Sequence, residues 1–257
     1  LAADHVIRNP TKFLLAIEAG KIHAEEGRLV TFGIVPTKAE TGYGYIEASE
    51  PLESDSLKGI PISRFIEKPD QNTATEFLKD DRFTWNSGMF LFKASTIIHE
   101  LDQLAPEIMS SCRAALGQKV PDLDFLRLEK EAFTKCPNLA IDVAVMEKTL
   151  LGTVIPLNAG WSDIGSWNAL WETTDRDLNE NVIKGRVIAN NSRNCYLRSE
   201  HRLVVALGVE NLLAIETDDA VLIAHQTEAR DDKSIVNLLE KEGSPEGIAH
   251  RKIYRPW

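Results

Sequence analysis

A strand-like run, a tight loop with one carboxylate and a helix-forming segment follow one another at residues 152–173. The run is Gly152–Leu157, and the loop at 161–167 places Asp163 between two tryptophans. In open α/β sheets ligands bind beyond the carboxyl ends of strands, so we expect Asp163 beside such a crevice. A carboxylate there suits a hard divalent cation that substrate phosphates bring in. In the alternative interpretation, Asp163 or Ser166 only caps the helix that follows.

Up to about residue 175, segments with helical spacing alternate with short apolar runs. We expect strands at 29–35, 60–67 and 89–92, the last preceded by a turn-bearing segment at 83–88. We expect helices at 9–26, 74–79, 95–104, 106–116, 124–133 and 140–148.

After residue 175 the pattern changes to short strands separated by turn residues at roughly 8–12-residue spacing. This spacing predicts an all-β region, either a sandwich or a coiled β-solenoid, followed by a helix at 231–241 and an extended lead-out at 250–257. The expected strands cover 182–183, 186–189, 194–198, 203–207, 212–216 and 220–224. We therefore predict one domain at residues 1–175 and a smaller β-rich domain at 176–257.

Charge and cysteine usage limit the partners and the compartment. The net charge is −10 and no basic patch stands out, which argues against nucleic acid as the main partner. No run is long and apolar enough to span a membrane, and no signal peptide is recognisable. The three cysteines are widely spaced, which favours the reducing cytoplasm. The sequence begins without an initiator Met and stops within an extended segment, so we expect a piece taken from inside a longer protein.

Two candidate positions carry charge at the ends of expected strands. Asp4, beside His5, follows a strand-like start and could be a second metal-binding carboxylate, although an N-cap or surface turn is the commoner role. Glu67 and Lys68 precede Pro69, which ends a strand. A lysine there suits a phosphate and a glutamate suits sugar hydroxyls. The alternative is an exposed ion pair worth about 0–1 kcal/mol.

Two further candidates are suited to contact with a polar ligand. Gly42 and Gly44 flank Tyr43 and would let a ligand approach the backbone closely, although an ordinary turn explains them equally well. Asn86 offers a donor and an acceptor together, which fits a hydroxyl-rich ligand, and its alternative role is to start a turn. Each of these features is weak evidence for a function when it is taken by itself.

Taken in order, these features resemble a known family. The resemblance rests on residues 3–7, 41–46, 65–69, 85–90, 141–148 and 161–167, and it extends over essentially the whole chain. The chain resembles the bacterial sugar nucleotidylyltransferases, and within them the mannose-1-phosphate guanylyltransferases, also called GDP-mannose pyrophosphorylases. Residues 250–257 resemble the bridge into an isomerase-type cupin domain that follows in the long members.

The resemblance implies an α/β fold, with a Rossmann-like nucleotidyltransferase domain followed by a smaller β-rich, solenoid-like domain. It implies that GTP and mannose 1-phosphate give GDP-mannose and pyrophosphate, for polysaccharide and nucleotide-sugar biosynthesis. Asp4 and Asp163 would hold one Mg²⁺. Gly44, Glu67 and Asn86 would hold the mannose, and Lys68 would face its phosphate. With Asp4 and Asp163, Lys68 would make up the catalytic set. The oligomeric state stays open, a homodimer included.

One departure from the family pattern matters. The family's Gly-rich loop, of the type Gly-x-Gly-x-Arg-x-x-Pro, cradles the triphosphate with its backbone amides, and these 257 residues contain no such segment. We therefore expect the sugar and metal half of the site without the nucleotide half, and an isolated chain that is inactive. Two alternatives remain, namely a nucleotidylyltransferase for another hexose 1-phosphate and a non-catalytic assembly or regulatory module with the same fold.

Overall fold

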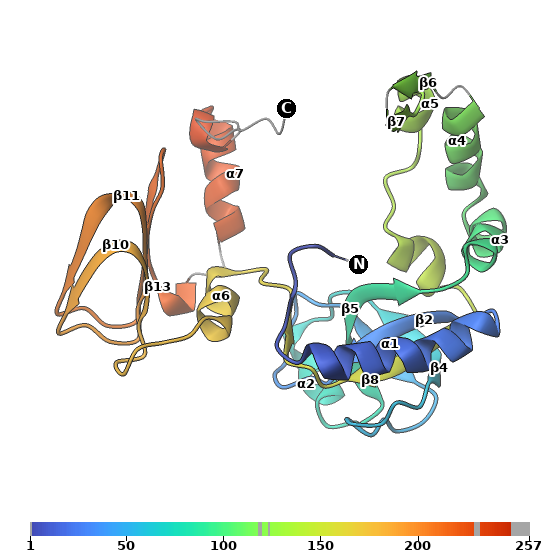
Figure 1. Cartoon of the computed structure of the whole chain (residues 1–257), viewed down its shortest axis with the longest axis horizontal. Helices are drawn as coiled ribbons and strands as arrows, with labels where there is room; N and C mark the ends of the chain where they lie inside the picture. Colours follow the sequence, from blue (N-terminus) through green and yellow to red (C-terminus); the bar gives the residue numbers. More distant parts are fainter. Residues whose placement is uncertain (1, 118–119, 123, 229–231, 248–257) are drawn as a thin grey trace. The chain divides into compact units, whose positions relative to one another are not determined.

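A computed structural model describes residues 2–117, 120–122, 124–228 and 232–247 of the chain (Figure 1). The chain forms two compact units. The first comprises Ile7–Trp161 together with the residues before Asp4, and the second comprises Asp4–Val6 together with the chain from Ser162 onward. The chain passes between the units at β1 (Val6–Ile7) and β9 (Trp161–Ser162), which form a two-stranded sheet.

The first unit is built on a closed ring of five strands. Their order is β2 (Leu29–Ile34), β5 (Phe83–Leu91), β3 (Tyr45–Ala48), β4 (Ile60–Ile66) and β8 (Gly152–Leu157). Strands β2 and β8 run parallel and are buried along their whole length, whereas the other pairs in the ring are antiparallel. Together with the surrounding helices, this sheet confirms the predicted α/β class.

Helix α1 (Pro10–Glu25) packs on this sheet through small residues. The Asn9 side chain caps it by accepting a hydrogen bond from the Lys12 amide at 3.0 Å, with Pro10 in the first turn. Ala16, Gly20 and Ala24 are its buried residues, and a Cβ on Gly20 would lie only 3.3 Å from Val30. The helix can therefore lie close along β2 and β8 (Figure 1).

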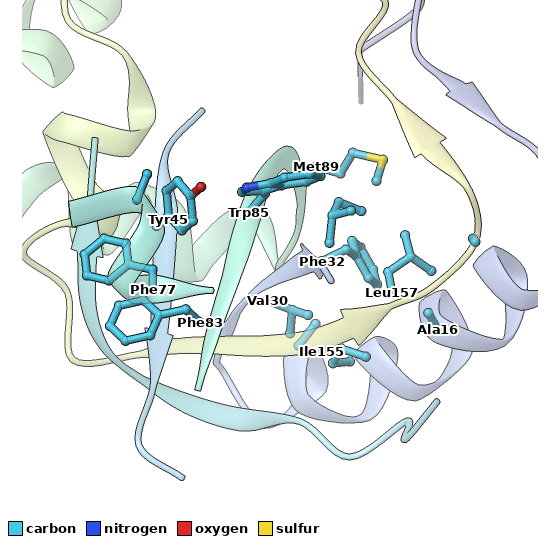
Figure 2. Close-up of a cluster of buried hydrophobic side chains, with 14 residues drawn as sticks. Ala16, Val30, Phe32, Tyr45, Phe77, Phe83, Trp85, Met89, Ile155 and Leu157 are labelled. Atoms are coloured by element: carbon cyan, nitrogen blue, oxygen red, sulfur yellow. The ribbon is translucent and has the colours of Figure 1, made fainter. Parts of the chain in front are cut away.

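Alternate side chains of the buried strands feed two separate hydrophobic clusters. Val30, Phe32, Ile155 and Leu157 belong to the cluster drawn in Figure 2, in which Phe77 and Phe83 stack with ring centroids 4.1 Å apart. Leu29, Ile46, Val154 and Val145 belong to the other. This alternation is the period-2 pattern of strands covered on both faces.

The remaining elements of the first unit are helices, a hairpin and a π-helical turn. They are α2 (Gln71–Phe77), α3 (Ala94–Leu104), α4 (Pro106–Gly117), the hairpin β6–β7 (Val120–Asp122 and Phe125–Arg127), α5 (Lys130–Thr134) and a π-helical turn, η1 (Asp142–Met146).

The helix predicted at 124–133 is wrong, because β7 fills its first part and Glu129 caps only the short α5. The helix predicted at 140–148 is a single π turn. Residues 83–88 are not a separate turn, because they belong to β5, which pairs with neighbouring strands on both sides. Gly88, at φ 66°, is a local irregularity within this one strand.

The second unit contains a four-stranded sheet in sequence order. Strands β10 (Val182–Asn190), β11 (Tyr196–Leu207) and β12 (Leu212–Glu216) pair in parallel, and β13 (Val221–His225) closes the sheet antiparallel to β12. Successive parallel strands without intervening helices are the pattern of a coiled β-solenoid and not of an antiparallel sandwich. The runs predicted at 182–183 and 186–189 are one strand, and those at 194–198 and 203–207 are another.

Helix α6 (Trp167–Thr173) belongs with this sheet. Trp167, Leu170 and Trp171 pack against buried Val182 and Tyr196. By backbone contacts, this helix lies in the same compact unit as the sheet. Helix α7 (Asp232–Glu242) covers most of the predicted helix, while residue 231 and the predicted lead-out lie outside the described residues. Short 3₁₀ turns lie at Gln226–Glu228 and Pro245–Gly247.

Within the described part of the chain, no helix has the length and apolar character needed to cross a membrane.

Candidate functional site

Strand register brings three of the predicted site residues into one row. Tyr45 of β3 pairs with Ile66 of β4 on one side and with Trp85 of β5 on the other. The next step along these antiparallel strands aligns Gly44 with Glu67 and Asn86, and the Asn86 amide donates to the Gly44 carbonyl at 2.8 Å. Gly44, Glu67 and Asn86, expected together from the sequence, therefore form one polar cluster, which we call the β3–β5 cluster.

The absence of a side chain at Gly44 makes room for this cluster. A Cβ on Gly44 would lie 2.7 Å from Glu67 Oε2 and 3.3 Å from the Phe65 ring. The space around Gly42 is different, because nothing lies within 4 Å of a Cβ built there. Of the two glycines in the Gly42–Gly44 segment, Gly44 is therefore the one at which a side chain would displace its neighbours.

Lys68 is the second residue after the end of β4 and is held beside Glu67. Its Nζ lies 3.2 Å from Glu67 Oε1, and its backbone has φ 44°, a left-handed conformation that non-glycine residues seldom adopt. Both side chains are exposed to solvent. The pair can thus offer a cation and a hydrogen-bond acceptor at the end of the strand, which is the presentation predicted from Pro69.

Asp142 is a member of this site that the sequence reading did not single out. Its Oδ1 accepts a hydrogen bond from Asn86 Nδ2 at 2.8 Å, across 56 positions of sequence. The sequence did contain a signal, since Asp142 lies in the segment 141–148 that carries part of the family resemblance. Its partner could not be identified from that segment, because the pairing depends on how η1 meets β5.

An aromatic cluster joins three segments that carry or adjoin predicted residues. Tyr43 meets the Trp85 ring edge-on at 5.3 Å between centroids and meets the Trp161 ring in the same way at 5.6 Å. Trp85 precedes Asn86 and Tyr43 precedes Gly44, so these contacts fix the backbone on which the β3–β5 cluster is built. Edge-to-face pairs add about 0.5–1.5 kcal/mol each beyond the area they bury.

Asp163 occupies a tight turn after β9. Its Oδ1 accepts from the Gly165 amide at 3.0 Å, and a Cβ on Gly165 would come within 2.6 Å of Oδ2. Helix α6 is instead capped by Ser166, whose Oγ accepts from the Ala169 amide at 3.2 Å. Of the two residues considered as caps, Ser166 serves and Asp163 does not.

Asp4 is exposed just before β1 and belongs to the same compact unit as Asp163. Two carboxylates offer the hard oxygen ligands that Mg²⁺ prefers, and Mg²⁺ is commonly held by one or two carboxylates plus substrate phosphates. The chemistry of this donor pair therefore fits the predicted ion. Among the residues that the structure describes, no group of three or more His, Cys, Asp or Glu side chains could hold a metal by itself.

A separate cavity of about 310 Å³ lies between α1 and the end of β8. An ion pair between Lys12 and Asp55, with Nζ and Oδ1 2.7 Å apart, lies at its wall. None of the predicted site residues lines it. The candidate site is therefore defined by its converging polar groups and not by this cavity.

Two family models match successive parts of the sequence. The nucleotidyl transferase model matches residues 1–180, and the mannose-phosphate isomerase/GMP-like β-helix domain model matches residues 185–239. The second match covers β11, β12 and most of β10, in agreement with the solenoid pattern.

Curated relatives match over the full length of the chain. A mannose-1-phosphate guanylyltransferase of Salmonella montevideo is 48% identical over 100% of this chain and 55% of its own length. Those of Klebsiella pneumoniae and Escherichia coli K12 are 44% and 42% identical, again over all of this chain and 55% and 54% of theirs. The chain thus spans about half the length of the curated relatives it matches.

A solved structure agrees with the fold. The structure described as a mannose-1-phosphate geranyltransferase from Thermus thermophilus superposes with a TM-score of 0.79 at 29% identity, covering 93% of this chain and 68% of that one. A mannose-6-phosphate isomerase structure from Helicobacter pylori gives 0.56 at 34% identity, over 62% and 61% of the two chains.

Proposed function

The chain belongs to the nucleotidyl transferase family, and we propose that it forms the sugar-binding and metal-binding part of a mannose-1-phosphate guanylyltransferase. The observation that carries the proposal is the β3–β5 cluster, in which a carboxylate, an amide and a bare glycine backbone converge. Such groups suit a ligand rich in hydroxyls. The names of the curated relatives support mannose 1-phosphate as that ligand.

In the proposed reaction, a phosphate oxygen of mannose 1-phosphate attacks the α-phosphorus of GTP. The bond between the α-phosphorus and the bridging oxygen breaks, so that GDP-mannose forms and pyrophosphate leaves. Glu67, Asn86 and the Gly44 backbone orient the sugar, and Lys68 faces its phosphate. Most of the catalysis then comes from positioning and from neutralisation of charge on the phosphates.

Asp4 and Asp163 are the proposed holders of Mg²⁺. When bound, the ion supplies positive charge to the phosphate oxygens. The turn at Asp163 supports this role, because the Gly165 amide holds one carboxylate oxygen and so fixes the direction of the group. The side chain of Asp4 is exposed to solvent and can reorient when a ligand arrives.

Pyrophosphate release by the full-length protein tests the proposed function. Mannose 1-phosphate and glucose 1-phosphate would each be offered with each of the four nucleoside triphosphates in the presence of Mg²⁺. We expect release with mannose 1-phosphate and GTP well above the other combinations. A preference for glucose 1-phosphate would indicate another hexose-1-phosphate nucleotidylyltransferase. Absence of release with every pair would favour a non-catalytic module.

A further inference from the structure

The side-chain amide of Asn86 is held at both ends. Its Nδ2 donates to Asp142 Oδ1 at 2.8 Å, and its Oδ1 accepts from the Gly88 amide at 3.1 Å. The Asn86 backbone is tied separately to the Gly44 carbonyl. Every part of this residue therefore has a defined direction within the β3–β5 cluster.

These two partners determine which way the amide faces. An ionised carboxylate only accepts hydrogen bonds and a backbone N–H only donates, so reversing the Asn86 amide would break both bonds and oppose like groups. Without Asp142, the amide nitrogen would lose the acceptor that keeps it in place. An amide free to reverse would offer a hydroxyl either a donor or an acceptor, and it would then distinguish one sugar from another less well.

The backbone and the core packing of the first unit also fix the position of Asp142. It begins the π turn η1, where its carbonyl accepts from the Glu147 amide five residues ahead at 2.9 Å. Val145 and Met146 of the same turn are 0% and 2% exposed and belong to a hydrophobic cluster of the first unit. Single π turns occur frequently at functional sites. This one anchors a carboxylate against the core while directing it towards Asn86.

We propose that Asp142 is a positioning residue for sugar recognition, which acts by fixing the donor and acceptor ends of the Asn86 amide. This inference rests on the proposed function, in which Asn86 contacts the sugar of the sugar phosphate. Asp142 stabilises the orientation of the Asn86 amide that a hydroxyl-bearing ligand would contact. Asp142 itself is not assigned a contact with the ligand.

A double-mutant cycle in the full-length protein tests the inference. Asp142→Ala should raise the KM for mannose 1-phosphate about tenfold or more, since a hydrogen bond to a charged group is lost, and change the KM for GTP less than twofold. Asn86→Ala should raise the same KM, and adding Asp142→Ala to it should cause little further increase. Asp142→Asn keeps an acceptor and should fall between wild type and Asp142→Ala. Equal effects of Asp142→Ala with and without Asn86 would overturn the proposal.

A matched carboxylate controls for a general loss of structure. Asp102 of α3 has an oxygen 2.6 Å from Arg113 on α4, so Asp102→Asn also removes charge from a bonded carboxylate but lies outside the β3–β5 cluster. We expect it to leave both KM values unchanged. Thermal unfolding of every variant shows whether a raised KM reflects unfolding. A loss that follows the melting temperature and affects both substrates would assign Asp142 a structural role only.

A second measurement keeps this inference separate from the proposed function. The side-chain NH₂ resonances of Asn86, identified by their loss in Asn86→Ala, should exchange slowly with solvent in wild type and faster in Asp142→Ala, with or without substrate. If pyrophosphate release identifies another sugar phosphate, the cycle is repeated with that compound. Unchanged exchange in Asp142→Ala would refute the orienting role even if the enzyme activity is as proposed.

Discussion

At the scale of single residues, the site depends on small distances around Gly44. Its φ is not in the left-handed region, so space and not backbone freedom explains why glycine is needed there. The nearest obstacle to a methyl group is the end of the Glu67 side chain, which is exposed and can move. A substitution here should therefore disturb ligand binding more than folding.

We expect Gly44→Ala to raise the KM for mannose 1-phosphate at least tenfold while destabilising the fold by only about 1 kcal/mol, the low end of overpacking costs. Steady-state kinetics and thermal unfolding measure the two effects. Gly42→Ala is the matched control, because the space around its Cβ is open, and it should leave the KM unchanged. A Gly44→Ala variant with normal sugar binding would remove Glu67 from the proposed sugar contacts.

Lys68 should act on one substrate only. Since the proposal assigns it to the sugar phosphate, Lys68→Ala should raise the KM for mannose 1-phosphate much more than the KM for GTP. Its ion pair with Glu67 is exposed, and exposed pairs contribute only about 0–1 kcal/mol, so stability should change little. Equal increases in the two KM values would contradict this placement.

The proposed metal ligands are tested by charge removal. Asp163→Asn and Asp4→Asn in the full-length protein should each lower turnover about 10²–10³-fold, as expected when a charge-stabilising group is lost. Turnover would be measured across a Mg²⁺ titration, with Asp175→Asn, an exposed aspartate of the second unit, as the control. Near-normal activity of either variant at every Mg²⁺ concentration would exclude that residue as a ligand.

At the scale of elements, one buried carboxylate supports the irregular middle of β11, between its two stretches of regular pairing with β10. Glu216 of β12 is 2% exposed, and its Oε2 accepts from the backbone amides of His201, Glu200 and Arg202 at 2.9, 3.0 and 3.2 Å. The His201 amide first, then those of Arg202 and Glu200, lower the pKa of Glu216 to about 2, against the opposing effect of burial. The ionised group thus satisfies three amides where the regular pairing of β11 with β10 is interrupted.

This lowered pKa predicts how acid affects the second unit. The folded-state pKa lies below the ordinary value of 4.5, so the stabilisation is complete above pH 4.5 and is lost as pH falls towards 2. Glu216→Gln should therefore lower the melting temperature at pH 7, with a difference from wild type that shrinks in acid. Glu210→Gln, which removes an exposed partner of Arg193, should have little effect. A difference that stays constant from pH 7 to pH 2 would contradict this role.

At the scale of the whole molecule, the Gly-rich loop that the family resemblance leads us to expect for the nucleotide is the main departure from the family pattern. No Gly-rich phosphate loop occurs in the 257 residues, whereas the groups proposed for the sugar and the metal do. A polypeptide of this sequence should therefore bind GTP negligibly and mannose 1-phosphate weakly at best. Calorimetric titration with GTP and Mg²⁺ measures this, with full-length protein as the positive control. Tight, stoichiometric binding of GTP would place the nucleotide site within this chain.

The sequence by itself determined the features whose signals lie within a few residues. Asn9 and Pro10 predicted the start of α1, Ser166 was one of two residues considered as a cap for α6, and the buried run Gly152–Leu157 was recognised as a strand. The change to short strands after residue 175 also predicted the β-rich region. Capping, turn chemistry and periodicity act locally, so a single sequence can reveal them.

Only the tertiary structure decided how these pieces meet. The register between β3, β4 and β5 set Gly44 against Glu67 and Asn86, and a shift of one residue would have turned these side chains to the other face. The bond between Asn86 and Asp142 spans 56 positions, and β5 is one strand because neighbours on both sides hold it extended. Such contacts depend on packing between distant segments, for which the local residue pattern carries no signal.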